Sequence, residues 1–148
     1  VKAAATIYQR VKLVLDNDLQ PSKVLETSEE ELREAGLSRQ KTSYLYSLAN
    51  AFRSKPEEYE KLYDLSDEAV VQRLTAIKGI GVWTAQMFLM FTLLREDVFP
   101  IGDLGIRRGM EIFLYDGEKQ EQVTLIERAK IWEPYRSVAS LALWKAQG

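Results

Sequence analysis

Hydrophobic residues recur three and four positions apart along almost the whole chain, which is the spacing of amphipathic α-helices. No stretch alternates strictly between apolar and polar residues over more than a few positions, so the pattern predicts an all-α fold. We expect a single helical domain over residues 1–148. The predicted helices cover residues 1–10, 28–36, 37–54, 67–77, 82–94 and 104–114, with a brief helical piece after Pro56 and two last helices that separate near Pro134.

Several residues mark the predicted helix boundaries. Ser28 and Glu31 have the spacing of a capping box, in which each side chain accepts a hydrogen bond from the backbone N–H of the other residue. Ser66 and Asp103 are predicted to cap the helices that follow them, because a short side chain can accept an N–H left free in the first turn. The first helix has no capping residue before it, as though the chain began inside an element.

The break between two predicted helices at residues 78–81 is the first indication of a function. Gly79 and Gly81 interrupt the helical pattern and an apolar helix restarts at once, which predicts a helix-hairpin-helix. The backbone N–H groups bared at such a turn can bind one phosphate of a nucleic acid, and the carbonyls near Ile77 and Gly79 could hold a bridging monovalent cation. A Gly-x-Gly sequence alone also suits a plain turn, so this interpretation depends on residues downstream.

Asp103 has two compatible predicted roles. As an N-cap it stabilises its helix by about 1 kcal/mol. The helix amides and Arg107, one turn on, should keep its pKa low. A permanently charged carboxylate accepts protons poorly but stabilises a nearby cation, which suits a reaction through a positively charged sugar, such as cleavage of a glycosidic bond.

Aromatic side chains near these residues have a packing role and a binding role that the sequence leaves open. Trp83 is predicted to face the crevice toward Asp103 from the start of its helix, where a flat ring could stack on an extruded base. Packing in the core is the ordinary role of Trp144. The further candidate walls of the pocket, for which packing is also the ordinary role, are Tyr44, Tyr46 and Met87.

Composition then restricts the chemistry. The chain has 148 residues, of which 46% are hydrophobic, enough to bury one core. It has no cysteine, which excludes disulfides and a cysteine-ligated iron–sulfur cluster, and no histidine, the usual general base and commonest metal ligand. We expect no cofactor. No apolar stretch approaches the roughly 20 residues of a membrane span, and the start has no basic-then-apolar signal pattern, so we expect an intracellular protein, in the cytoplasm or nucleoid, or in the nucleus of a eukaryote. We also expect a monomer.

The net charge of −2 argues against a nucleic-acid partner, because phosphate binders usually carry excess positive charge. The acidity lies mainly away from the hairpin: residues 1–68 hold 10 basic and 13 acidic side chains, whereas residues 69–115 hold 5 and 4. A small positive face near the hairpin is therefore possible, although each cation alone also suits a solvated helix face. The candidate phosphate contacts are Lys78, Gly79, Ile80, Gly81, Arg107, Arg108 and Arg136, with Lys41 as a further candidate.

Three motifs resemble those of the helix-hairpin-helix DNA glycosylases, in particular the alkylbase type, the 3-methyladenine DNA glycosylase II family. They are GIGVWTA at residues 79–85, DVFPIGDLG at residues 97–105 and WEPYRSVA at residues 132–139, with Leu143 and Trp144 after them. Residues 1–10 and 36–38 fit the same pattern, so the resemblance covers nearly the whole chain.

The resemblance implies a base excision repair enzyme that flips an alkylated purine out of duplex DNA and hydrolyses its N-glycosidic bond. Asp103 corresponds to the catalytic carboxylate, which stabilises the sugar cation and orients water. Trp83 stands where bifunctional relatives carry a Schiff-base lysine, which implies a monofunctional hydrolase. Trp144 matches an aromatic residue that lines the base pocket, and Met87 stands where some members have a pocket tyrosine.

In that family a helix and a loop precede the segment that matches Val1, and the loop carries a residue that wedges into the DNA stack. We therefore expect residues 1–148 to be a glycosylase catalytic domain that lacks this helix and loop, and to be weakly active or inactive, because a wedge offsets an unstacking cost of a few kcal/mol.

Two alternatives to a glycosylase stay open. One is a non-catalytic DNA-binding module in which Asp103 is only a cap, and the other is a helical protein-interaction domain, which leaves the glycine hairpin unexplained.

Overall fold

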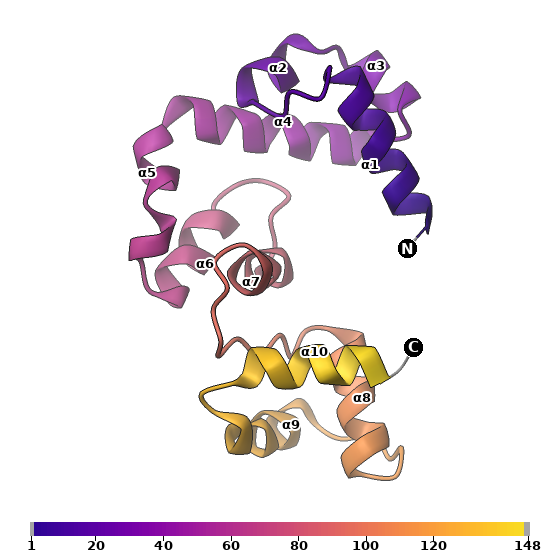
Figure 1. The fold of residues 1–148 in the computed structure, drawn as a ribbon, viewed down its shortest axis with the longest axis vertical. Helices are drawn as coiled ribbons and strands as arrows, with labels where there is room; N and C mark the ends of the chain where they lie inside the picture. The colour runs from indigo at the N-terminus through magenta and orange to yellow at the C-terminus, as the bar shows by residue number, and fades with distance from the viewer. Residues whose placement is uncertain (1, 147–148) are drawn as a thin grey trace. The chain divides into compact units, whose positions relative to one another are not determined.

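Helices are the only regular elements in residues 2–146, the part of the chain that the computed structural model describes (Figure 1). The all-α class predicted from the sequence is confirmed. None of the described helices is both long and apolar enough to cross a membrane. The elements are α1 (Lys2–Val14), α2 (Pro21–Glu26), α3 (Glu29–Glu34), α4 (Arg39–Ser54), α5 (Pro56–Glu60), the 3₁₀-helix η1 (Leu62–Asp64), α6 (Asp67–Thr75), α7 (Val82–Phe91), α8 (Leu104–Leu114), α9 (Gln122–Ala129), the 3₁₀-helix η2 (Lys130–Trp132) and α10 (Arg136–Ala146).

Residue contacts gather in two compact units, which divide between Ile80 and Gly81. The first unit holds α1 to α6, and the second holds α7 to α10. The sequence predicts one domain around one core. Periodicity shows which face of a helix is buried but not which helices share a core, so it could not reveal this division.

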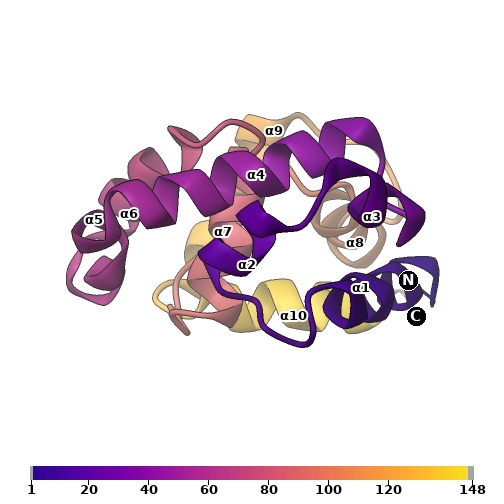
Figure 2. The same cartoon turned by 90° about the horizontal axis from the view of Figure 1, so that it is seen from above.

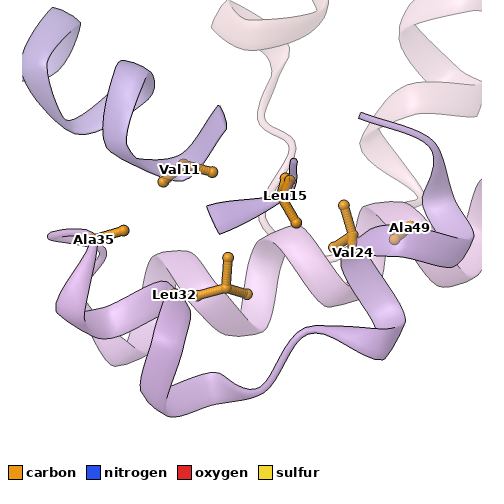
Figure 3. Close-up of a cluster of buried hydrophobic side chains, with 6 residues drawn as sticks. All are labelled: Val11, Leu15, Val24, Leu32, Ala35 and Ala49. Atoms are coloured by element: carbon orange, nitrogen blue, oxygen red, sulfur yellow. The ribbon is translucent and has the colours of Figure 1, made fainter. Parts of the chain in front are cut away.

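The core of the first unit lies between α1, α2, α3 and α4. Helix α4 contacts both α2 and α3, which lie along it in two perpendicular views (Figures 1 and 2). The side chains of this core point toward one another from all four helices and the turns that follow them (Figure 3). They are Val11, Leu15, Val24, Leu32, Ala35 and Ala49.

The core of the second unit forms where α8 contacts α9 and α10. Helix α8 contributes Ile106 and Met110, which are fully buried. Leu125 and Ala129 face them from α9, and Leu143 faces them from α10. This packing fixes the first turn of α8 against α10, which matters because the candidate catalytic residues lie on these two elements.

The predicted caps are confirmed. The Ser28 side chain accepts the Glu31 N–H while the Glu31 carboxylate accepts the Ser28 N–H, so the capping box is complete. The Ser66 side chain accepts the Ala69 N–H at the start of α6. These interactions are local, so three or four residues of sequence are enough to predict them.

Helix ends and one short helix differ from the prediction. Helix α2 was missed, because six residues are too few for a helical period, although Pro21 at its first position is a start signal. Helix α7 ends at Phe91, since Leu94 has a left-handed φ of 54°. The apolar pattern continues past this end because Leu93 is buried in the connector. Helix α6 also stops two residues early, and α1 runs on to Val14.

Candidate active site around Asp103

Asp103 occupies the N-cap of α8. Its backbone is extended, and its Oδ1 accepts the N–H of Ile106 at 3.0 Å, as the capping prediction requires. The turn before it closes through the Asp103 N–H, which donates to the carbonyl of Pro100 at 2.8 Å. The carboxylate is therefore held at a helix N-terminus, where the helix dipole favours negative charge.

Two tryptophans of the second unit bind the same carboxylate through their indole N–H groups. The Nε1 of Trp83, in the first turn of α7, donates to Asp103 Oδ2 at 2.8 Å. The Nε1 of Trp144, in the last turn of α10, donates to Asp103 Oδ1 at 2.9 Å. Each carboxylate oxygen thus accepts an indole N–H.

These contacts decide the ionisation of Asp103. Partial burial raises its pKa, but hydrogen bonds from Trp144, from the Ile106 N–H, from Trp83 and from the Gly105 N–H outweigh burial, so the pKa lies below the ordinary value. Arg107, which the sequence analysis expected to help, is not among these causes. The group is a fixed anion, suited to stabilise a nearby positive charge and unsuited to give up a proton.

The two indoles differ in exposure. Trp144 is half-buried, packs against the core of the second unit and stacks on Phe91 with ring centroids 6.2 Å apart. Trp83 is 49% exposed, which leaves much of its ring free to meet a planar ligand. The geometry thus brings together three of the residues named from the sequence: Asp103, Trp83 and Trp144.

Met87 lies one helical turn after Trp83, on the same face of α7. Its side chain is half-buried. The position is compatible with the predicted pocket wall, and it makes Met87 a neighbour of Trp83 along the helix.

Tyr44 and Tyr46 have structural roles in the first unit. A Cβ atom placed on Gly79 would collide with Cγ of Tyr44, so the Tyr44 ring rests directly on the hairpin glycine. Its hydroxyl accepts a hydrogen bond from Gln40 at 2.7 Å. The Tyr46 hydroxyl donates to the carbonyl of Thr27 at 2.8 Å. Tyr44 thus supports the turn, a contact that sequence spacing does not reveal, and its role as a base-pocket wall stays a prediction.

The turn at residues 78–81 is tight and contains a left-handed glycine. Gly79 has a φ of +95°, which L side chains rarely adopt, and the Ile80 N–H donates to the Ile77 carbonyl at 3.0 Å. Gly81 caps α7 without a side-chain hydrogen bond, so no side chain competes for the N–H groups of the first turn. Lys78, in the same turn, is exposed.

The candidate arginines have different environments. Arg136 binds Asp97 with Nε and Nη2 at 2.7 and 2.8 Å and Glu133 with Nη1 at 2.9 Å, so it has a structural role beside its predicted one as a phosphate contact. Arg108 donates to Glu111 and to the Gly117 carbonyl.

Arg107 is half-buried, and its Nε is enclosed without a hydrogen-bond partner. Lys41 is exposed on α4.

Three residues of this region were not found from the sequence. Asp97 holds Arg136 from 39 positions away, and Phe91 stacks on Trp144 across the helices. No local pattern indicates such pairs. Gly105 gave a usable signal, because a glycine just inside a helix often marks a close approach of another group.

Across residues 2–146, no three His, Cys, Asp or Glu side chains gather in a way that could hold a metal ion. The predicted cation ligands are instead backbone carbonyls, and that of Ile77 already accepts one N–H.

Comparisons with known proteins identify the family of the chain. Residues 1–134 match the family described as the HhH-GPD superfamily base excision DNA repair protein. DNA-3-methyladenine glycosylase 1 of Schizosaccharomyces pombe is 36% identical over 97% of this chain and 64% of its own length. DNA-3-methyladenine glycosylase of Saccharomyces cerevisiae is 35% identical over 78% of this chain and 49% of its own length.

Solved structures show the same similarity. A DNA-3-methyladenine glycosidase from Bacillus halodurans has a TM-score of 0.88 and 41% identity, over 100% of this chain and 69% of that one. A 3-methyladenine DNA glycosylase of S. pombe in complex with abasic DNA has a TM-score of 0.88 and 36% identity, over 97% of this chain and 71% of that one. The chain spans about half to two thirds of the length of the two yeast relatives.

Proposed function

The chain belongs to the HhH-GPD superfamily of base excision DNA repair proteins, and we propose that it hydrolyses the N-glycosidic bond of alkylated purines in duplex DNA. The observation that carries this proposal is the Asp103 carboxylate, held ionised by two indoles and a helix N-terminus. The names of the relatives, DNA-3-methyladenine glycosylases, support the substrate class. A structural relative bound to abasic DNA supports duplex DNA as the partner, since an abasic site is what base release leaves.

In the proposed reaction, the bond between C1′ and the purine nitrogen breaks and its electron pair leaves with the base. The deoxyribose then carries a positive charge, which the Asp103 carboxylate stabilises at close range. A water molecule adds to C1′, its proton passes to solvent, and a free base and an abasic site result. Asp103 contributes a fixed charge rather than a proton.

The chemistry of the leaving group fits this site. An alkylated purine such as 3-methyladenine carries a positive charge on its ring, so it departs as a neutral molecule and needs little general-acid help. The chain has no histidine to serve as such an acid, and Asp103 is ionised. Unmodified purines are poor leaving groups, so this site selects substrates by their chemistry as well as by shape.

A base flipped from the duplex needs a surface to replace its stacking neighbours. The half-exposed ring of Trp83 supplies one beside the carboxylate, and Met87 on the same face of α7 extends it. The partly buried ring of Trp144 forms a fixed wall on the other carboxylate oxygen.

The hairpin supplies the grip on DNA. The free N–H groups at the start of α7, the exposed Lys78 and the turn glycines suit one backbone phosphate, and a monovalent cation on the carbonyls of Ile77 and Gly79 would add positive charge there. Arg107 and Arg108, on α8, are further candidate contacts.

We propose that the enzyme is monofunctional, needs no cofactor and acts as a monomer in the cellular compartment that contains the DNA. The residue at the start of α7 that could approach the sugar is Trp83, whose indole cannot form a Schiff base.

The test is release of bases from methylated duplex DNA with the protein in excess, followed by chromatography of the free bases. We expect 3-methyladenine and 7-methylguanine above the spontaneous rate, and DNA that breaks only after alkali. Binding of duplex DNA without base release would contradict the proposed activity of residues 1–148. A covalent protein–DNA adduct trapped by borohydride would contradict the monofunctional assignment.

A further inference from the structure

We infer that Gly105 is a positioning residue for the proposed reaction: having no side chain, it lets the Trp144 indole hold one oxygen of Asp103 and so present the other to the substrate. The catalytic consequence rests on the proposed function. The arrangement of the three groups does not, and it can be tested in the free protein.

Gly105 lies at the second position of α8, beneath the Trp144 indole. A Cβ atom built there would lie 3.0 Å from Asp103 Oδ1 and 3.0 and 3.2 Å from Cδ1 and Nε1 of Trp144. Ordinary contacts of a carbon atom are about 3.5–4.0 Å. A methyl group at this position would therefore displace the indole, the carboxylate or both by a few tenths of an ångström.

The backbone does not account for a glycine here. Gly105 is helical, and its φ is not in the left-handed region that favours glycine. A glycine inside a helix costs about 0.5–1 kcal/mol relative to alanine. The compensation visible in the structure is the close approach of Trp144 to the carboxylate.

The two oxygens of Asp103 are held by different kinds of partner, in addition to the hydrogen bond from the Gly105 N–H, which an alanine would keep. Oδ1 accepts from the Ile106 N–H at 3.0 Å and from the half-buried Trp144 at 2.9 Å. Oδ2 accepts from Trp83, which is 49% exposed. Oδ1 is therefore the anchored oxygen, and Oδ2 is the oxygen that a substrate or water can reach when the Trp83 ring moves.

Loss of the Trp144 hydrogen bond should loosen this orientation and raise the pKa of Asp103, because Trp144 contributes the largest of the interactions that lower it. The neighbours that set this pKa are neutral donors. The charged side chains on the two helices that pack here, α8 and α10, are Arg107, Arg108, Glu111, Arg136 and Lys145, and α7 has none.

The experiment compares Gly105→Ala, Trp144→Phe and the double variant with the wild type. Trp144→Phe keeps an aromatic ring and removes the N–H. Gly102→Ala is the matched control, since its Cβ would meet nothing within 4 Å. The readouts are single-turnover release of 7-methylguanine and an NMR titration of the Asp103 carboxyl carbon.

We expect Trp144→Phe to slow release about tenfold and Gly105→Ala about two- to tenfold, as loss or weakening of one hydrogen bond to a charged group implies. Both should move the Asp103 titration to higher pH, and Gly105→Ala should have a smaller effect in the Trp144→Phe background than in the wild type, because the hydrogen bond it weakens is already absent there. Gly102→Ala should behave as the wild type.

An unshifted Asp103 titration in Gly105→Ala, or additive effects in the double variant, would overturn the inference. If Gly105→Ala does not fold, an unshifted titration in Trp144→Phe overturns it. If the wild type releases no base, the proposed function fails, and the NMR titration still decides the positioning role.

Discussion

Asp103 serves as a helix cap and as the proposed catalytic group with the same negative charge. The hydrogen bonds that satisfy the first turn of α8 and the two indoles also keep the carboxylate ionised, so the capping role supports the catalytic one. Many catalytic carboxyl groups have a raised pKa because they must donate a proton. Here the direction is the opposite, which suits electrostatic stabilisation of a cation.

The lowered pKa of Asp103 predicts the pH dependence of base release. A carboxyl group with a lowered pKa is charged above that value, so its contribution to catalysis and to stability is complete above the ordinary value of 3.8 and is lost only as pH falls through the lower folded value. The chain has no histidine or cysteine to titrate at intermediate pH.

We therefore expect the single-turnover rate to be flat between about pH 5 and pH 8, after subtraction of spontaneous depurination. A bell-shaped profile, or an acid limb with its midpoint near pH 6, would show that a group with a raised pKa acts in the reaction.

For single residues, the sequence predicted the interactions that join near neighbours along the chain. The Asp103 side chain caps the helix by accepting an N–H only three positions on, so neighbouring residues were enough to predict this N-cap, and it is confirmed. The indole hydrogen bonds could not be predicted from spacing, because Trp83 and Trp144 lie 20 and 41 positions from Asp103 along the chain. They depend on how α7, α8 and α10 pack in the second unit.

The hairpin at residues 78–81 is shaped by its own glycine and by the tyrosine that rests on it. Gly79→Ala would force an L residue into a left-handed φ and would place its methyl group against the Tyr44 ring with no room for it. We expect a loss of about 1–3 kcal/mol in the free energy of unfolding and weaker binding of undamaged duplex DNA.

Urea denaturation and a binding titration at fixed salt measure these two effects. Gly102→Ala, a glycine with open space around it and no left-handed φ, should leave both unchanged. Equal stability of the two variants would mean that the turn tolerates a side chain at residue 79.

The start of α10 is anchored by Arg136 on Asp97, a paired contact with both members mostly buried. The hydrogen bonds from Arg136 hold the pKa of Asp97 below its ordinary value. Stability from such a group is present above the unfolded pKa and is lost as pH falls through the folded one.

We expect Asp97→Asn to reduce the free energy of unfolding by about 1–3 kcal/mol at pH 7, and the difference from the wild type to shrink once pH falls below 3.8. Urea denaturation of the two proteins at pH 7 and below pH 3.8 measures this difference. The exposed Asp64→Asn is the control. A similar loss of unfolding free energy in both variants would show that the Arg136 contact has no special role in stability.

The sequence predicted that most of the helices exist, but it placed their first and last residues less accurately. Caps such as Ser28 and Ser66 are local signals and were found. The end of α7 was placed too late, because Leu93 is buried for tertiary reasons and prolongs the apolar pattern. Arg136 was assigned to DNA because a charged helix residue gives no sign of a partner 39 positions away.

For the whole molecule, the net charge of −2 shows that affinity for DNA cannot come from a general positive surface. Under the proposed function, we therefore expect the phosphate contacts at the hairpin and α8, and the chemistry at one carboxylate. Periodicity predicted the all-α class, and the ordered motifs predicted the family, whereas the division into two units depends on contacts that a linear pattern does not contain.

The most direct test of this account replaces Asp103 with Asn, which caps a helix about as well but carries no charge. We expect the single-turnover release of 7-methylguanine to fall at least about 100-fold, while binding of duplex DNA stays within about twofold of the wild type. Asp64→Asn, in the first unit, should release base at the wild-type rate. Equal rates of release by the wild type and by Asp103→Asn would contradict the account.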